Sequence, residues 1–279
     1  MRTIGIMQGR LTPPKGRGVQ FFPAKEWGGE FVEAKKLGLS DIDFIFPYEE
    51  FEKNPLWTEA GIEKIKIVIS ESGVGVKDVC GMFFMPQLLS ENDERVRKEN
   101  VAVLKKLTLQ AQKIGAKSIT LPLLDTASLK DEQAEKMLAQ SLNEILPDAK
   151  VAGITILLET DLPPQRFLSL LEQFPHENVA AVYDIGNSSS FGYNPEEEIS
   201  VLGKHIALVH TKDRVRGGGN VPLGEGDANF DAVFKALKKI QYQGNFMIEA
   251  ARGEEGKEVE TVSAQRSFTS RYIEKYVLK

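Results

Sequence analysis

Short apolar runs alternate along the chain with longer segments in which apolar residues recur every three or four positions. The short runs are rich in Val, Ile, Phe and Leu, and most are apolar throughout. Such runs are typical of strands in a parallel sheet that is buried on both faces. The pattern predicts strands at Thr3–Met7, Asp41–Phe46, Val74–Cys80, Ser118–Pro122, Thr155–Glu159, Val179–Asp184, Ile206–His210 and Phe246–Glu249.

The longer segments have the spacing of amphipathic helices, and Ala24–Leu37 and Glu94–Ile114 are two examples. The expected apolar stripes are Trp27, Phe31, Ala34 and Leu37 in the first and Val96, Val103, Leu107 and Ile114 in the second. Several helical segments are followed by a glycine, at Gly38, Gly73, Gly115 and Gly153, where a left-handed cap is expected. The pair Pro163 and Pro164 indicates a loop that leads into the first turn of a helix.

Eight β-then-α units follow one another without a break in composition, which predicts an α/β fold of the (β/α)8 TIM barrel type. Such a barrel takes about 250 residues, so the 279 residues are expected to form a single domain over 1–279. A doubly wound open sheet is the alternative fold. The first strand is not followed by a Gly-x-Gly-x-x-Gly turn, and no predicted helix opens at the triplet 217–219, so a nucleotide site is disfavoured.

The amino-acid composition limits the classes of partner and the cellular compartment that we expect. The chain has 35 basic and 40 acidic residues and a net charge of −5, whereas nucleic-acid binders are more often basic. Cys80 is the only cysteine, which suits a reducing compartment. The first seven residues lack a signal-peptide core, and no apolar run approaches the roughly 20 residues of a membrane span. We therefore expect a cytoplasmic protein with no nucleic-acid or membrane partner; the sequence is compatible with a homo-oligomer.

Ionisable groups stand at the ends of the last four predicted strands, at Glu159, Asp184, His210 and Glu249. They are spaced by about one β/α unit, with a longer third interval. Active sites of TIM barrels lie at the carboxyl ends of the strands, so these groups are expected to meet at one mouth. Crowded carboxylates repel one another unless a cation offsets their charge, and oxygen ligands with one imidazole suit Mn²⁺, Mg²⁺, Co²⁺ or Zn²⁺. The sequence therefore predicts one divalent metal ion.

The other two histidines are expected to lie away from this mouth. His205 and His210 lie five residues apart on one strand, so they point to opposite faces and stand roughly 16 Å apart at 3.3 Å per residue. His205, at the start of the strand, is predicted to be structural. His176 lies in a loop and is predicted to be solvated.

Three motifs carry a resemblance to a known family, and the matching region extends from about Thr155 to Glu249. The motifs are Asp184-Ile185-Gly186-Asn187, Val209-His210-Thr211-Lys212-Asp213 and Val221-Pro222-Leu223-Gly224-Glu225-Gly226. Together they resemble the sugar phosphate isomerase/epimerase family of xylose-isomerase-like TIM barrels. Within it the chain is most similar to the L-ribulose (L-xylulose) 5-phosphate 3-epimerase branch, also called hexulose-6-phosphate isomerase.

The resemblance implies that Glu159, Asp184, His210 and Glu249 are metal ligands and that Glu159 and Glu249 form the catalytic acid/base pair. It also implies a sugar or sugar phosphate as the small-molecule partner. Related epimerases of free ketoses carry a histidine three residues after the metal-binding aspartate, where this chain has Asn187. That difference favours the phosphosugar branch and makes Asn187 a candidate substrate contact.

Chemistry of this kind begins at a hydrogen on the carbon next to a ketone. A metal that chelates the ketone and the neighbouring hydroxyl stabilises the enediolate formed on deprotonation. Carboxylates on opposite sides of the sugar would remove and return a proton and invert the stereocentre, which gives 3-epimerisation. One carboxylate serving both carbons on the same side would give aldose–ketose isomerisation, and the sequence leaves both outcomes open.

Further substrate contacts are predicted from cations near the expected mouth. Lys212, Arg214 and Arg216 follow the histidine in a glycine-rich loop whose backbone N–H groups favour an anion such as phosphate. Arg10, at the end of the first strand, is another candidate. The alternative for the loop residues is three solvated surface charges.

Other functions use the same fold. A free-ketose epimerase or an inosose-type dehydratase would need much the same metal site. A DNA-repair enzyme resembling endonuclease IV would need several histidine ligands, and this chain has three histidines in all. A sugar-binding barrel without catalysis is the non-enzyme alternative; it has no need of the two glutamates Glu159 and Glu249.

Overall fold

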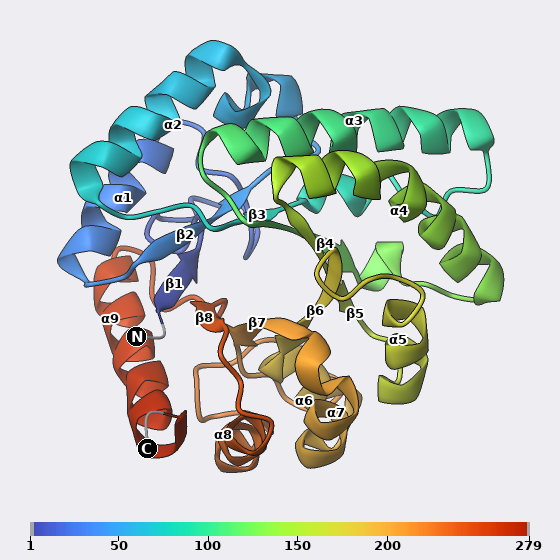
Figure 1. Cartoon of the computed structure of the whole chain (residues 1–279). Helices are drawn as coiled ribbons and strands as arrows, with labels where there is room; N and C mark the ends of the chain where they lie inside the picture. The colour runs from blue at the N-terminus through green and yellow to red at the C-terminus, as the bar shows by residue number, and fades with distance from the viewer. Residues whose placement is uncertain (1–2, 278–279) are drawn as a thin grey trace.

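Eight parallel strands form a closed barrel in chain order in the computed structural model, which describes residues 3–277 (Figure 1). The strands are β1 (Ile4–Met7), β2 (Asp41–Ile45), β3 (Asp78–Cys80), β4 (Ser118–Leu123), β5 (Thr155–Thr160), β6 (Val179–Asp184), β7 (Ile206–Thr211) and β8 (Asn245–Ile248). β8 pairs in parallel with β1, for example Met247 with Gly5, and closes the ring. The predicted (β/α)8 TIM barrel is confirmed, and the open doubly wound sheet is wrong because neither end of the sheet is left as an edge.

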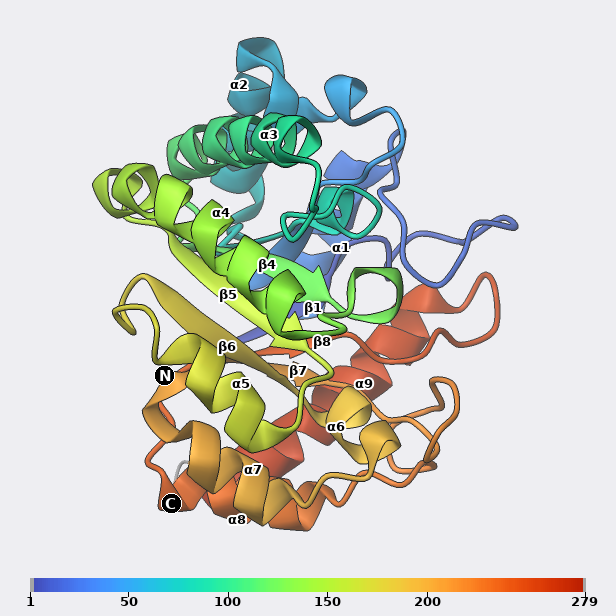
Figure 2. The ribbon, with the colours of Figure 1, turned by 90° about the vertical axis from the view of Figure 1, so that its right-hand side faces the viewer.

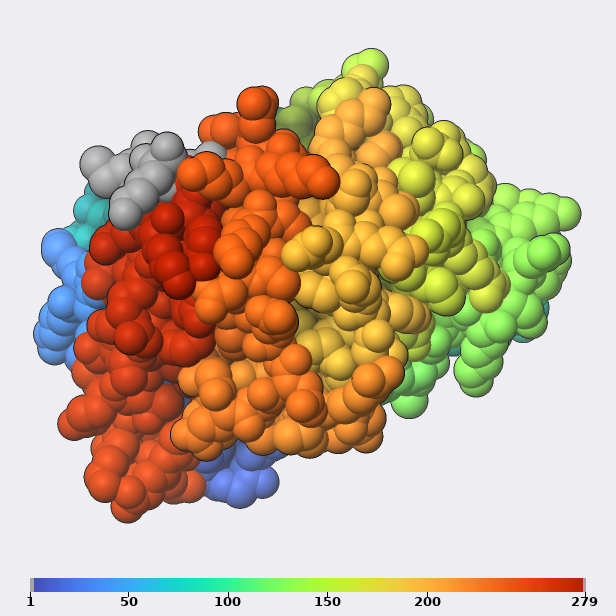
Figure 3. Space-filling view, turned by 90° about the horizontal axis from the view of Figure 1, so that it is seen from below, coloured from blue at the N-terminus to red at the C-terminus, as the bar shows by residue number. Residues whose placement is uncertain are grey.

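Helices surround this barrel (Figures 1 and 2). They are α1 (Trp27–Lys36), α2 (Glu59–Ser72), α3 (Glu94–Lys113), α4 (Glu132–Ala152), α5 (Pro164–Leu171), α6 (Ile185–Phe191), α7 (Pro195–Leu202), α8 (Phe230–Lys239) and α9 (Glu258–Tyr272). Figure 3 shows the face on which the segments of α9, α8 and α6–α7 lie side by side in chain order. Within residues 3–277, no helix has the length and the apolar character that a membrane crossing requires.

The barrel interior is apolar below its mouth on the side of the last four strands. Side chains alternate between the two faces of a strand, so every second residue points inward. An inner cluster fills this part of the barrel: Leu157, Ala180, Val182, Leu208 and Met247. The outward-facing residues of the same strands pack instead under the helices, in the large core that includes Val209 and Phe246.

Most local predictions are confirmed. The glycines predicted as helix caps at 38, 73, 115 and 153 all have positive φ, between 66° and 88°, and Pro164 begins α5. The third strand is shorter than predicted, because Gly75 makes only an isolated bridge to Asp41 and regular pairing begins at Asp78. The stripe predicted for α3 is also partly wrong, because Val96 and Val103 are only half-buried. The buried apolar stripe of α3 is Val101, Leu104, Leu107 and Ala111.

Two helical glycines provide a matched test of packing. A Cβ at Gly61 in α2 would lie 2.2 Å from the carbonyl oxygen of Pro55, whereas one at Gly29 in α1 would meet nothing within 4 Å. Alanine is favoured over glycine inside helices by roughly 0.5–1 kcal/mol, so Gly29→Ala is expected to stabilise the fold by that amount. Gly61→Ala is expected to destabilise it by about 1–3 kcal/mol, because the backbone must move. Urea unfolding of both variants checks this, and an unchanged or raised stability of Gly61→Ala would contradict the described packing.

Candidate metal centre

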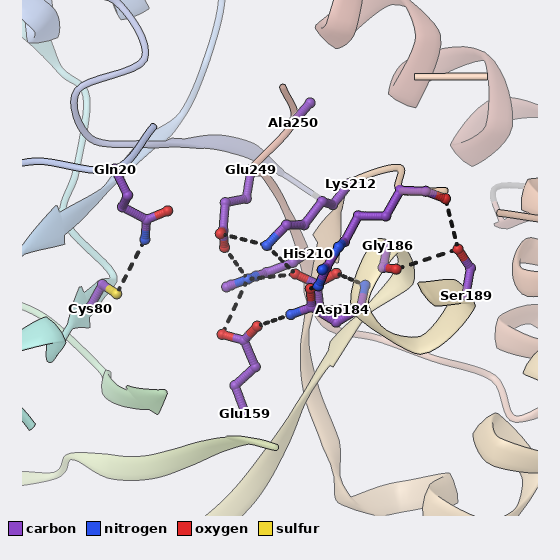
Figure 4. Close-up of polar contacts among 12 residues, drawn as sticks. Gln20, Cys80, Glu159, Asp184, Gly186, Ser189, His210, Lys212, Glu249 and Ala250 are labelled. Atoms are coloured by element: carbon purple, nitrogen blue, oxygen red, sulfur yellow. Dashed lines mark hydrogen bonds and ion pairs between the residues drawn. The ribbon is translucent and has the colours of Figure 1, made fainter. Parts of the chain in front are cut away.

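The last four strands bring one carboxylate or imidazole each to the mouth of the barrel. Each of these residues stands two positions after a member of the inner cluster. Because side chains alternate between the two faces of a strand, it also points into the barrel. Glu159 follows Leu157, Asp184 follows Val182, His210 follows Leu208 and Glu249 follows Met247. All four are buried, and one ligand atom of each lies within 4.8 Å of the others (Figure 4). The predicted convergence at one mouth is therefore observed.

The geometry of this group fits a cation. His210 Nδ1 lies 2.8 Å from Glu249 Oε2 and 3.9 Å from both Glu159 Oε2 and Asp184 Oδ2. Nevertheless, neither Nδ1 nor Asp184 Oδ2 has an aligned hydrogen-bond partner among the described residues, although both are buried. Buried polar atoms are normally satisfied, and a cation held among these ligand atoms would satisfy them. Three carboxylates and one imidazole match the ligands of a divalent metal ion.

Lys212 makes the two glutamates unequal. Its Nζ lies 2.9 Å from Glu249 Oε1 and 3.3 Å from Asp184 Oδ2, and it is buried beside them. Although burial acts to raise it, Lys212 and His210 hold the pKa of Glu249 well below its usual range. Burial and the charge of Glu249 raise the pKa of Glu159 to about 8. The carboxyl group of Glu159 therefore holds a proton more strongly than that of Glu249.

Asn187 and Arg214, predicted to contact the substrate, lie at the centre but bond to protein groups. Asn187 lies in the first turn of the short helix α6, and Asp184 Oδ1 accepts the Asn187 backbone N–H at 2.7 Å. The Asn187 Nδ2 donates to Glu159 Oε1 at 2.7 Å, and Arg214 Nη1 donates to Asn187 Oδ1 at 2.8 Å. Their role toward a substrate stays a prediction.

The remaining two predicted substrate contacts lie in different surroundings. Arg10 is buried, and its guanidinium donates to the carbonyls of Ala250 at 3.1 Å and Val19 at 2.6 Å. It therefore fixes the loop that follows β1 against the end of β8. Arg216 is exposed and lies against Gly192, at the end of α6, in a hollow separate from the centre. The structure does not bring Arg216 to the four candidate ligands.

Sequence reasoning missed a neighbouring cavity of about 430 Å³. Its walls include Gln20, Phe22, Ile45, Tyr48 and Met82, from loops and strand ends of the first three β/α units. Gln20 lies across the opening from Glu249 and His210, beside Cys80 (Figure 4). The adjacent aromatic residues at 21 and 22, in the loop after β1, were a signal for it.

Two buried aspartates inside the barrel were also missed. Asp43 on β2 and Asp78 on β3 are buried, and burial raises the pKa of both. Asp78 accepts hydrogen bonds from Ser118 and, at 2.7 Å, from Thr120 Oγ1. The alternation Asp41-Ile42-Asp43 indicated that Asp43 lies on the inner face, but the segment was interpreted only as an apolar strand.

The other histidines stay away from the centre. His205 is buried in a short turn before β7, and His176 is exposed, with their rings 6.4 Å apart. Of the residues that the structure describes, one group of three or more His, Cys, Asp or Glu side chains is arranged to hold a metal, and neither histidine belongs to it. A histidine-rich site with several metals, as in an endonuclease IV-like enzyme, has no support in this arrangement.

A closed parallel barrel with a buried cluster of three carboxylates and one imidazole at its carboxyl-end mouth is consistent with a TIM barrel that holds a divalent metal ion. Comparison with known families identifies the particular one. Residues 24–270 match the xylose isomerase-like TIM barrel family, and the chain belongs to it.

Curated relatives are similar over most of the chain, and solved structures share its fold. The chain is 28% identical over 245 residues to the L-ribulose-5-phosphate 3-epimerase UlaE of Escherichia coli (strain SMS-3-5 / SECEC), covering 85% of this chain and 86% of that protein. The structure of an L-ribulose 3-epimerase matches with a TM-score of 0.78 and 18% identity over 99% of this chain and 96% of that one. A xylose isomerase domain protein from Planctomyces limnophilus matches with a TM-score of 0.76 and 19% identity, over 100% and 99% of the two chains. The two structural matches support the fold.

Proposed function

We propose that this protein is a metal-dependent isomerase or epimerase that removes a proton next to a carbonyl group, and that its reaction is 3-epimerisation of a ketose phosphate. The observation that carries the proposal is the convergence of Glu159 and Glu249 on one buried centre with Asp184 and His210. Glu159 lies in β5 and Glu249 directly follows β8, with two strands between them, so they can flank a ligand. The similarity to UlaE supports the choice of a ketose phosphate.

In this mechanism Glu159, Asp184, His210 and Glu249 would hold one divalent ion, which we expect to be Mn²⁺, Mg²⁺, Co²⁺ or Zn²⁺. When bound, the cation supplies charge that polarises the ketone and stabilises an enediolate. Glu249, kept ionised by Lys212, is placed to accept the proton from the carbon next to the ketone. Glu159 stands on the other side of the centre and is placed to return a proton to that carbon.

The experiment that tests this proposal is a screen of pentulose and hexulose phosphates by NMR in D2O with the metal-loaded protein. Epimerisation is expected to place deuterium at carbon 3 and to yield the epimer, whereas aldose–ketose isomerisation would place it elsewhere. Activity is expected to disappear with a chelator and to return with Mn²⁺. Loss of water from the substrate instead of inversion would indicate a dehydratase, and absence of exchange with every sugar would leave a sugar-binding barrel.

A free-ketose epimerase is the second candidate, because Lys212 and Arg214 are engaged by protein groups rather than left free for a phosphate. We still expect the phosphorylated ketose to be preferred. This expectation rests on the similarity to L-ribulose-5-phosphate 3-epimerases and not on Lys212 or Arg214. The measurement is kcat/KM for matched ketose and ketose-phosphate pairs. Equal efficiency on both would remove the phosphate from the proposal and leave the free ketose as substrate.

A further inference from the structure

The loop after β7 fixes the guanidinium group of Arg214. Its Nε and Nη2 both donate to the carbonyl oxygen of Gly218, at 3.0 and 2.8 Å. The loop folds back on itself, since Arg214 bridges Asn220 and the Val215 N–H donates to the Gly219 carbonyl at 3.2 Å. The third nitrogen, Nη1, is thereby aimed at Asn187. Arg214 is thus held by its own loop and points into the protein.

This contact determines the orientation of the Asn187 side-chain amide. A guanidinium has only donors, so the amide must turn its oxygen toward Arg214 and its NH2 group toward the other side. On that side lies Glu159 Oε1, at 2.7 Å from Nδ2. Asn187 and Glu159 are both buried, with 4% and 5% of their surfaces exposed. A single directed chain therefore runs from the Gly218 carbonyl through Arg214 and Asn187 to one oxygen of Glu159.

We propose that Arg214 and Asn187 are positioning residues for Glu159, rather than contacts to the substrate. With Oε1 occupied by Asn187, the other oxygen, Oε2, is left facing the centre, 3.9 Å from His210 Nδ1. Glu249 has a separate support, because Lys212 donates to its Oε1 at 2.9 Å. Two cations that stand two residues apart in the chain thus orient the two glutamates at the centre. The inference rests on the proposed function for its kinetic consequence but not for its effect on metal binding.

The decisive substitution is Asn187→Asp, because it keeps the size of the side chain and the acceptor for Arg214 while removing the donor to Glu159. Partners of metal ligands usually contribute about 10- to 100-fold in metal affinity or activity. We expect Asn187→Asp and Arg214→Met each to raise the Kd for Mn²⁺ about tenfold or more, and the double variant to add little to either. Arg95→Met is the matched control, since that side chain is 79% exposed on α3. Calorimetric titration with Mn²⁺ measures this without any substrate, and circular dichroism verifies that each variant is folded.

Steady-state kinetics separate positioning from substrate binding. Loss of positioning is expected to lower kcat about tenfold or more with little change in KM, whereas loss of a phosphate contact would raise KM and leave kcat unchanged. Unchanged Mn²⁺ affinity in both single variants would overturn the proposal, as would an effect on KM alone. If the wild-type protein turns over no sugar, the proposed function fails, but the Mn²⁺ titrations still decide whether Asn187 and Arg214 orient Glu159.

Discussion

Replacing Glu249 with glutamine is expected to lower turnover by about 10²-fold or more, the usual size of a lost general base. Glutamine keeps an oxygen near the centre and nearly the same volume, but its amide cannot accept the proton. The change also removes the carboxylate that Lys212 contacts at 2.9 Å and His210 at 2.8 Å. Because glutamine still offers an oxygen to the metal, metal content is expected to fall less than turnover does. The measurement is kcat at saturating Mn²⁺, together with metal content per chain.

Glu255→Gln is the control for this variant, because it is the same substitution at an exposed residue in the loop after β8, away from the centre. It is expected to behave as the wild type. Near-normal turnover of Glu249→Gln would mean that another group removes the proton. Equal losses of metal and turnover would mean that Glu249 serves mainly as a ligand.

Replacing His210 with alanine is expected to reduce bound metal sharply while the barrel stays folded. The imidazole is fully buried, and its Nδ1 faces all three carboxylates. Without it, three acids surround the position with no nitrogen ligand, and no other histidine lies near enough to replace it. The measurement is metal content per chain after dialysis, with circular dichroism as the check on folding.

His176→Ala provides the comparison, since the His176 side chain is 56% exposed and contacts Glu177 at the surface. Full metal occupancy in His210→Ala would exclude His210 as a ligand. A loss of folding in that variant would be detected by circular dichroism, and His210→Gln, which restores a polar side chain, then gives the test in a folded protein.

The strands and the convergence of the four candidate ligands could be predicted from sequence because they depend on repetition. A buried parallel strand needs an apolar run, and a barrel turns successive strand ends to one mouth. Glu159 and His210 therefore had to lie near each other once their strands were placed. The start of β3 was missed because the residues from Val74 onward are apolar enough for a strand, while the chain at Gly75 pairs only once.

Contacts made by loop side chains could not be predicted in the same way. Arg10 was predicted to contact the substrate, but it donates to the backbone carbonyls of Val19 and Ala250, and Ala250 is distant in sequence. The orientation of Arg214 depends on a bend at Gly218 that has no periodic signal. The walls of the cavity, such as Tyr48, come from irregular segments whose paths are set by packing.

The pairing of β1 with β8 has a consequence for biosynthesis. β1 leaves the ribosome before β8, so an emerging chain carries an unpaired β1 edge until about residue 248 is available. Glu249 follows immediately, so the fourth side chain of the cluster arrives with the strand that closes the ring. The complete set of four therefore exists only in a closed barrel.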